Sequence, residues 1–565
     1  MGAPDRDQAV RARCAALPDN IADRVAEHAR ARPGGVALLE HHTGEVVTWR
    51  ALDRAATALA AKLLSSGFAK GDVLATSLPL LKEHVFLQLA CYRVGVVLAP
   101  LDLRLRAGEL RGCLEQLRPK GFFFAGAPAL LPVMREVVGK VPGVGHYVQF
   151  QKERSGILPG ATSVRDFTRD LRRRYLAALL SGAVRRARRR VSRRDGCLVI
   201  FTTGSTGSPK AALLCHEGIL AQNAALSVGF GLRLDDRLLV NLPPSHVGCA
   251  TELLGTALYE GIPAVLLHVF DAERSLEAIA RHRVTVLGQI PALFNLEWNH
   301  RRFREYDLSS VRLAIYGGQS VPRAFLDRLR GMAPEIGTGL GLTETSGFCT
   351  YTVPGASADD LAASIGHPLP HCPLTVRAPM RPDGTAGAEV PPGELGEICF
   401  AGSQLFLGYL GSPAATAAAL SRDGVLYTGD LGRYDAQGLH LAGRSGLTIK
   451  PKGFQVFPGD VESAVLARLD GAATAAACVA AEHAVWSEAI VLFVECAPGG
   501  ELRAEQVLEA CQGLASYARP SHVEVVPAGS LPLNRVAKID YLALRERARE
   551  IVARLRAEGG WDSRG

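Results

Sequence analysis

The feature that most constrains the fold is a regular alternation of short apolar runs with segments of helical periodicity. Helical patterns such as Trp49–Ser66 and Leu81–Val94 separate apolar runs that have the length of buried strands. These runs are Val73–Ser77, Val96–Pro100, Gly121–Ala125, Leu198–Thr202, Arg237–Asn241, Ala264–Val269, Val284–Gln289 and Arg312–Tyr316. Strands that alternate with helices usually pair in parallel. The sequence therefore predicts an α/β fold with largely parallel sheets.

The pattern changes in the last third of the chain. From about Gly387 short strands are separated by Gly- and Pro-containing turns, which is typical of antiparallel β structure. After Arg444 about 120 residues follow with a mixed α+β pattern. Because 565 residues exceed what one compact core usually serves, we predict a large domain over residues 1–444 and a small domain over 445–565.

The positive charge is concentrated in one segment. The chain has a net charge of +8, and ten Arg with no acidic residue lie between Leu171 and Arg194. Without them the chain would be close to neutral, which argues against a general nucleic-acid surface. The apolar stretch Tyr175–Val184 within this segment suits a helix that rests on anionic lipid, so residues Arg172 to Arg194 predict a peripheral membrane contact. A solvated helix is the alternative.

The cysteines and the hydropathy indicate a compartment. Twelve Cys are scattered without a C-x-x-C pair, which fits reduced thiols better than disulfides or zinc sites. No apolar stretch approaches the roughly 18 residues of a membrane-spanning helix, and no signal-peptide core is evident. We therefore expect a cytoplasmic protein that is soluble or peripheral to a membrane.

The sharpest local motif is a loop rich in glycine and hydroxyl groups. An apolar strand that starts at Leu198 leads into the loop Thr-Thr-Gly-Ser-Thr-Gly-Ser-Pro, and Lys210 closes this loop. Glycines let backbone N–H groups approach phosphate oxygens, while hydroxyls and Lys add donors and charge. Alone, such a loop is equally consistent with a flexible turn.

Four further motifs follow the loop in order. They are Leu340-Gly-Leu-Thr-Glu344, Tyr427-Thr-Gly-Asp430, Gly443-Arg444 with Ile449-Lys450-Pro-Lys-Gly453, and Pro532-Leu-Asn-Arg-Val-Ala-Lys538. With the loop they resemble the adenylate-forming (AMP-binding) superfamily, most closely acyl-CoA synthetases, over nearly the whole chain. The resemblance implies ATP-dependent activation of a carboxylic acid to an acyl-adenylate, then thioester formation with coenzyme A. It also implies a small β-barrel-like part and a mobile C-terminal domain, with a hinge near Gly446.

The resemblance assigns roles to residues of the nucleotide site. The residues that would bind the β- and γ-phosphates are Thr202, Thr203, Ser205, Thr206 and Lys210. Those that would line the adenine site are Gly317, Gly318, Gln319, Gly339 and Leu340. Leu340 stands where relatives usually place an aromatic ring. Thr343 is assigned to the α-phosphate or the substrate carboxylate, and Glu344 with Thr202 to Mg²⁺, a hard cation that prefers oxygen. Asp430 is assigned to the ribose hydroxyls and Arg444 to ribose and phosphate.

The small domain supplies lysines for two steps, again by resemblance. Lys538 is assigned to the α-phosphate and the carboxylate, where negative charge accumulates during adenylation. Lys450, with Lys452 and Gly453, is assigned to the thioester-forming arrangement. The presence of Lys538 and of the phosphate, magnesium and ribose residues argues against a nucleotide-binding protein without turnover.

The segment around His246 narrows the substrate. Amino-acid-activating relatives place an Asp at the position of Val247, and a buried ammonium without a carboxylate is costly. The predicted acyl pocket, which includes Val247–Thr251, is mostly apolar or small and suits a fatty, alicyclic or aryl acid. His246 gates this pocket or contacts the carboxylate, unless it is a hydrogen-bonded core residue. Coenzyme A is the expected acceptor, with an acyl carrier protein as the alternative.

Overall fold

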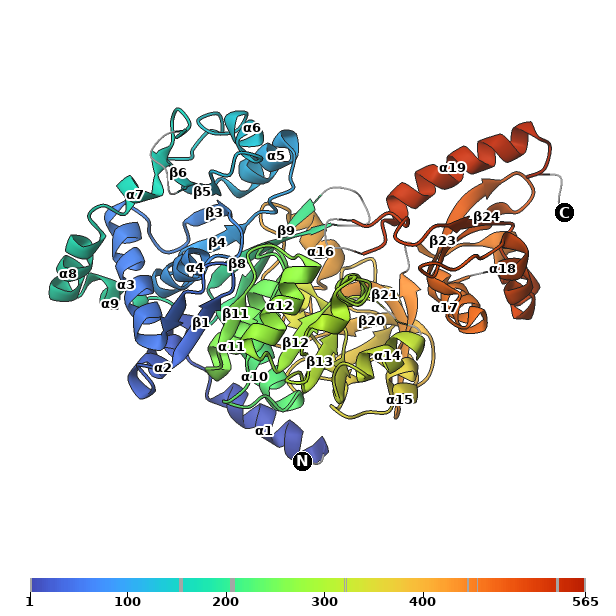
Figure 1. Cartoon of the computed structure of the whole chain (residues 1–565), viewed down its shortest axis with the longest axis horizontal. Coiled ribbons are helices and arrows are strands. Elements are labelled where there is room, and N and C mark those ends of the chain that lie inside the picture. Colours follow the sequence, from blue (N-terminus) through green and yellow to red (C-terminus); the bar gives the residue numbers. More distant parts are fainter. Residues whose placement is uncertain are drawn as a thin grey trace.

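The computed structural model describes residues 3–151, 156–203, 209–319, 321, 323–444, 447–454, 456–534 and 538–562. A large N-terminal part and a small C-terminal domain lie at opposite ends of the long axis (Figure 1). The predicted mixed α/β class is confirmed, and so is each of the eight predicted strands, all of which belong to two large sheets. Predicted hinge residue Gly446 lies outside the described residues.

The first large sheet has seven strands, of which all pair in parallel except the last. Its spatial order is β7 (Thr162–Ser163), β6 (His146–Phe150), β5 (Gly121–Ala125), β3 (Val73–Ser77), β4 (Val97–Pro100), β8 (Gly196–Thr203) and β9 (Pro209–Cys215). β9 returns antiparallel to β8, so the predicted phosphate loop joins two strands of a hairpin.

The second large sheet also has seven strands. Its order is β14 (Glu335–Thr338), β13 (Leu313–Tyr316), β12 (Val286–Gln289), β10 (Leu238–Val240), β11 (Ala264–Leu266), β1 (Val36–Glu40) and β2 (Val46–Thr48). All pairs are parallel except β1 with β2. The carboxyl ends of β12, β13 and β14 therefore lie at one edge, where ligands usually bind in α/β sheets.

Strand side chains alternate between a shared core and two outer cores. In β5, Phe123 joins the central core while Phe122 and Phe124 join an outer one. In β10, Leu238 and Val240 face the central core and Leu239 the opposite side. This alternation follows from the two-residue period of a strand.

Helices cover the inner and outer faces of the two large sheets. The central core takes side chains from α2 (Ile21–Ala31), α3 (Trp49–Ser65), α4 (Lys82–Val94), α10 (His216–Gly229) and α11 (Leu254–Glu260). The outer cores take α5 (Ala107–Leu117) and α6 (Leu131–Arg135) on one side, and α12 (Ala272–His282), α13 (Pro291–Trp298) and α14 (Arg323–Arg330) on the other. Burial on both faces explains why the strands read as continuous apolar runs.

The predicted antiparallel part is a four-stranded sheet. Its strands are β19 (Leu374–Arg377), β20 (Gly396–Phe400), β21 (Leu426–Asp435) and β22 (Gly438–Arg444), paired in chain order. In the described residues it is an open meander and not a closed barrel. Its long hairpin β21–β22 places Asp430 opposite Arg444.

The C-terminal domain has helices on both faces of a three-stranded sheet. The strands are β23 (Ala473–His483), β24 (Ser487–Cys496) and β25 (His522–Val526). One face packs on α17 (Pro458–Leu469) and α18 (Ala504–Ala510), and the other on α19 (Tyr541–Ala557). Each face buries its own apolar cluster, so this domain carries a core of its own.

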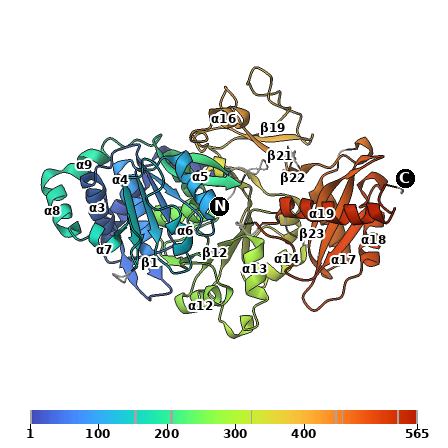
Figure 2. The ribbon, with the colours of Figure 1, turned by 90° about the horizontal axis from the view of Figure 1, so that it is seen from above.

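The basic segment folds as two helices at the far end of the molecule. α8 (Leu171–Ser181) and α9 (Ala183–Arg188) lie away from the C-terminal domain in both views (Figures 1 and 2). Among the described residues no helix is long and apolar enough to cross a membrane.

Candidate active site

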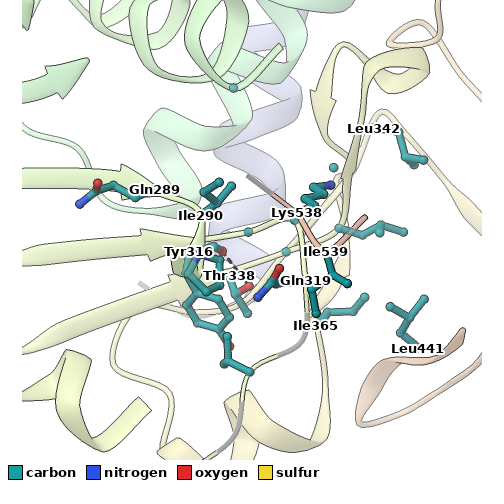
Figure 3. A pocket seen from close by; sticks show the side chains of 18 of the residues that line it. Gln289, Ile290, Tyr316, Gln319, Thr338, Leu342, Ile365, Leu441, Lys538 and Ile539 are labelled. Carbon is teal, nitrogen blue, oxygen red and sulfur yellow. Dashed lines mark hydrogen bonds between the residues drawn. The ribbon is translucent and has the colours of Figure 1, made fainter. Parts of the chain in front are cut away.

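A large cleft runs between the N-terminal part and the C-terminal domain. It has a volume of about 2040 Å³ and is lined by strand ends of the second sheet, by the β21–β22 hairpin and by the segment around Lys538. In Figure 3, Lys538 reaches into the cleft beside Ile290 and Gln319. Most of the predicted site residues that can be described line this one cleft: His246, Thr202, Lys210, Gly317, Gly318, Gln319, Gly339, Leu340, Thr343, Glu344, Asp430, Arg444 and Lys538.

The β8–β9 hairpin brings a hydroxyl and an ammonium to the cleft. Thr202 and Lys210 face each other across the strand pair, so the hairpin fixes their positions relative to each other. Thr203 ends β8. Ser205 and Thr206, which the sequence also assigns to phosphate, lie outside the described residues.

Glu344 has a partner that the motifs did not reveal. The Tyr409 hydroxyl donates a hydrogen bond to Glu344 Oε1 at 2.6 Å. Lys210 Nζ lies 5.3 Å from the centroid of the Tyr409 ring, within cation–π distance. Burial, together with the Glu344 charge, raises the pKa of Tyr409, so the phenol remains a donor at neutral pH. Tyr409 thus orients the carboxylate and contacts the predicted phosphate-binding lysine.

Asp430 and Arg444 form an ion pair at the cleft wall. Arg444 Nε donates to Asp430 Oδ1 at 2.8 Å, and the Asp430 side chain is only 8% exposed against 49% for Arg444. Burial raises the pKa of Asp430, while the charges of Arg444 and Lys538 oppose that shift. The carboxylate is therefore held in place by a strand pairing and by a cation.

Two glycines at the end of β13 leave space that side chains would fill. Gly318 has a φ of +92°, and a Cβ there would lie 3.4 Å from Lys538 Nζ. A Cβ at Gly317 would lie 3.1 Å from the tip of the Phe348 ring. Glycine at both positions keeps open the surface that the sequence assigns to adenine.

Gly339 is required for a different reason. A Cβ there would lie 2.1 Å from the backbone oxygen of Thr350, which cannot move aside without disrupting the chain. This glycine permits close backbone approach and places the following Leu340 on the cleft wall.

Lys538 is half-buried at the cleft and is held by hydrogen bonds to Asn534. Asn534 Oδ1 accepts a hydrogen bond from the Lys538 backbone N–H at 3.1 Å. The Asn534 backbone N–H donates to the Lys538 carbonyl oxygen at 2.7 Å. Burial and the Arg444 charge lower the pKa of Lys538, whereas Asp430 and Glu252 raise it. The ammonium is thus partly desolvated and has both positive and negative charges around it.

His246 lies inside the cleft as a neutral imidazole. Its Nδ1 accepts the backbone N–H of Gly248 at 3.0 Å, so its proton is on Nε2. Burial and the Lys538 charge lower the pKa of His246 to about 4. At neutral pH Nε2 is therefore a hydrogen-bond donor without a charge.

After His246 the lining of the predicted acyl pocket differs from the sequence prediction at several positions. Of the predicted run Val247–Thr251, Val247 and Gly248 line the cleft, but Cys249, Ala250 and Thr251 do not, and Glu252 does. The segment is a π-helix, Gly248–Leu253, whose spacing of five residues brings Glu252 onto the face of Val247. The only available signal was a lone acid in an apolar stretch.

The residues assigned to thioester formation lie elsewhere in the C-terminal domain. Lys450 is exposed, and its backbone N–H donates to Glu488 Oε2 at 2.6 Å. Lys452 has a positive φ of 55° and its Nζ lies 4.0 Å from the centroid of the Trp486 ring. Among the described residues that line the cleft, neither lysine is present, nor is Gly453.

Comparisons with known proteins agree with this geometry. The family described as AMP-binding enzyme matches residues 25–410, and the AMP-binding enzyme C-terminal domain matches residues 460–538. The chain is 30% identical to the indoleacetate–CoA ligase of Aromatoleum aromaticum, over 94% of this chain and 98% of that protein. It is 28% identical to the medium-chain fatty-acid–CoA ligase of Escherichia coli, over 93% of this chain and 90% of that protein.

A solved structure shares the fold. The crystal structure of the anthranilate CoA ligase AuaEII in complex with anthranoyl-AMP superposes with a TM-score of 0.81 at 22% identity, covering 96% of this chain and 99% of that one. The resemblance drawn from the five ordered motifs is thus confirmed. The chain belongs to the AMP-binding enzyme family.

Proposed function

We propose that this protein is an ATP-dependent acid–thiol ligase that activates a carboxylic acid as an acyl-adenylate and transfers the acyl group to coenzyme A. The observation that carries the proposal is the convergence of Lys538 from the C-terminal domain with Asp430, Arg444 and the Thr202–Lys210 hairpin on one cleft. The relatives named above are CoA ligases.

In the first step a carboxylate oxygen attacks the α-phosphorus of ATP and pyrophosphate departs. Thr202 and Lys210 hold the departing phosphates, and the Asp430 carboxylate accepts hydrogen bonds from the ribose hydroxyls. The neutral His246 donates Nε2–H to the carboxylate, which orients it without stabilising the ground state through a full charge. Lys538 stabilises the charge that develops between the carboxylate and the α-phosphate.

The residues present fit a magnesium ion bound together with the nucleotide. The described residues contain no cluster of three acidic, His or Cys ligands, so the protein would supply only the Glu344 carboxylate and the Thr202 hydroxyl. Mg²⁺ commonly binds through one carboxylate, waters and substrate phosphates, which matches this set. When bound, the ion would neutralise charge on the leaving pyrophosphate.

The second step uses a different face of the C-terminal domain. Lys450, Lys452 and Gly453 are outside the cleft while Lys538 is inside it, so this arrangement suits adenylation alone. A rotation of residues 445–565 against residues 1–444 about Gly446 would exchange the two faces. We propose that this exchange precedes attack of the thiol on the acyl-adenylate, which releases AMP.

The decisive experiment measures pyrophosphate release with a panel of carboxylic acids, with and without coenzyme A. Acid-dependent release and a coenzyme A thioester among the products are expected. Adenylation with no coenzyme A product, but with acyl transfer to an acyl carrier protein, would favour the alternative acceptor. No release with any fatty, alicyclic or aryl acid would refute the proposed function.

The basic helices favour a peripheral membrane contact. On α8 the side chains of Leu176, Leu179 and Leu180 are 50%, 55% and 91% exposed. Exposed arginines flank them on both sides: Arg172, Arg173, Arg185, Arg186, Arg189 and Arg190. Ion pairs of Asp170 with Lys62 of α3 and of Arg188 with Asp23 of α2 fix the helices to the body. Exposed leucines beside unneutralised arginines complement an anionic lipid surface.

Vesicle sedimentation tests this contact. The protein should bind phosphatidylglycerol vesicles more than phosphatidylcholine vesicles, and Leu180→Asp should release it. Equal recovery in the supernatant with both lipids would leave α8 as a solvated helix. The twelve free thiols support a reducing compartment, and we place the enzyme in the cytoplasm.

A further inference from the structure

Glu252 is a carboxylate deep inside the molecule that nevertheless keeps a free surface. It lies in the π-helical segment Gly248–Leu253 that precedes α11, and its side chain lines the cleft. It is half-buried because the cleft, not bulk solvent, contacts it. The adenylation chemistry described above does not use this residue.

Three glycines make room for the Glu252 carboxylate. A Cβ at Gly341 would lie 3.1 Å from Oε1, one at Gly347 would lie 3.0 Å from Oε1, and one at Gly248 would lie 3.4 Å from Oε2. Each of these distances from a Cβ to a carboxylate oxygen is at or below the short limit of ordinary van der Waals contact. The carboxylate therefore occupies a space that three separate backbone positions leave open.

Little in the protein compensates this charge. Among the described residues no ion pair of Glu252 with a Lys, Arg or His is found, and the backbone N–H of Phe348 is the hydrogen-bond donor that lowers its pKa. Burial raises the pKa of Glu252 to about 7, against the opposing effect of the Lys538 charge. A buried carboxylate with unfilled acceptor capacity is costly unless a ligand supplies a donor.

Phe348 extends from the neighbourhood of Glu252 to the reacting end of the cleft. The tip of its ring lies against Gly317, next to Gly318 and Lys538, whereas its backbone nitrogen lies 3.3 Å from the Cβ position of Gly341, beside Glu252. The two ends of one aromatic residue thus contact the two sites. A substrate whose carboxylate lies near Lys538 would present its remote end to Glu252.

We propose that Glu252 selects carboxylic acids that carry a hydrogen-bond donor, a hydroxyl or an amine, at the end remote from the carboxylate. This inference rests on the proposed function and specifies its substrate class. The pocket otherwise offers apolar walls such as Leu253 and Phe230, so the donor-bearing group would be the polar end of a small alicyclic, aryl or short aliphatic skeleton.

The test compares acids that differ only by exchange of a hydroxyl or amino group for a methyl group. Suitable pairs are meta- and para-hydroxybenzoate or aminobenzoate against the methylbenzoates, and ω-hydroxy acids against alkanoates of equal length. In the wild type, kcat/KM for pyrophosphate release should favour the donor by on the order of 10- to 100-fold, as for a hydrogen bond to a charged group.

Variants assign that preference to Glu252. Glu252→Leu should reverse the preference towards the methyl acid, and Glu252→Gln, which keeps one acceptor, should give an intermediate ratio. Glu297→Gln is the matched control, because Glu297 is a buried carboxylate already bonded to Ser275 and Gln289. It should leave the ratio unchanged.

The outcomes separate this inference from the proposed function. If no acid releases pyrophosphate, the proposed function fails. If acids are activated but paired acids react equally, or Glu252→Leu keeps the wild-type ratio, the role of Glu252 is refuted. Should Glu252→Leu fail to fold in a thermal unfolding assay, the wild-type and Glu252→Gln ratios decide the question.

Discussion

Replacement of Lys538 with Ala should abolish most adenylation while leaving ATP binding nearly unchanged. The Lys538 ammonium lies against Gly318 in a desolvated cleft, where one preorganised donor to developing charge contributes roughly 10²- to 10³-fold to the rate. Activity should not vanish, because Lys210 and Arg444 still line the cleft.

Lys450→Ala is the matched control for this experiment. It removes an ammonium from the same domain, but from an exposed position outside the cleft. Single-turnover pyrophosphate release should therefore fall only in Lys538→Ala, whereas thioester formation from preformed acyl-adenylate should fall in Lys450→Ala. Isothermal titration calorimetry checks ATP binding. Pyrophosphate release within a few-fold of wild type in Lys538→Ala would refute the assignment of this lysine to the first step.

Three further perturbations address other parts of the site. Asp430→Ala should weaken ATP binding by about 1.5 to 3 kcal/mol, the range for hydrogen bonds to a charged group, and an unchanged Kd would remove Asp430 from the ribose site. Tyr409→Phe keeps the ring beside Lys210 but loses the hydrogen bond to Glu344. The Mg²⁺ concentration for half-maximal pyrophosphate release should therefore rise about tenfold, the size of effect seen when a residue that orients a metal ligand is lost. A Mg²⁺ titration that superimposes on that of the wild type would contradict this. Because the pKa of Glu252 is about 7 and its ionised form accepts hydrogen bonds more strongly, the preference for donor-bearing acids should increase as pH rises through 7 and be flat in Glu252→Gln. Among the described residues, the titratable groups that interact with Glu252 or lie beside it are the Lys538 ammonium, the neutral His246 and the buried Cys349 thiol. A pH-independent preference in the wild type would count against Glu252.

The strands could be predicted because their pattern is local. Runs such as Gly121–Ala125 are buried on both faces, which requires apolar residues at every position and gives a signal within a few residues. The order of strands could not be predicted in the same way. β1 joins β11 although more than two hundred residues separate them in the chain, and such pairing depends on long-range packing.

The site was predictable where a motif is continuous in sequence. Thr202 and Lys210 frame one loop, and Asp430 and Arg444 meet across one hairpin, so their proximity follows from local structure. Tyr409 could not be found in this way, because its contact with Glu344 spans 65 positions. The prediction that Thr251 lines the pocket was wrong, because a π-helical turn is not evident from residue types.

The sequence by itself determined the α/β class, the succession of a large and a small domain, and the ordered motifs that identify the family. These follow from periodicity and from residue types within short windows. Only the tertiary structure decided that Lys538 is inside the cleft while Lys450 is outside it, and that Glu252 lines the same cleft. Burial, charge and free space at a position are set by residues distant in the chain, and the chemistry of a carboxylate or an ammonium depends on those surroundings.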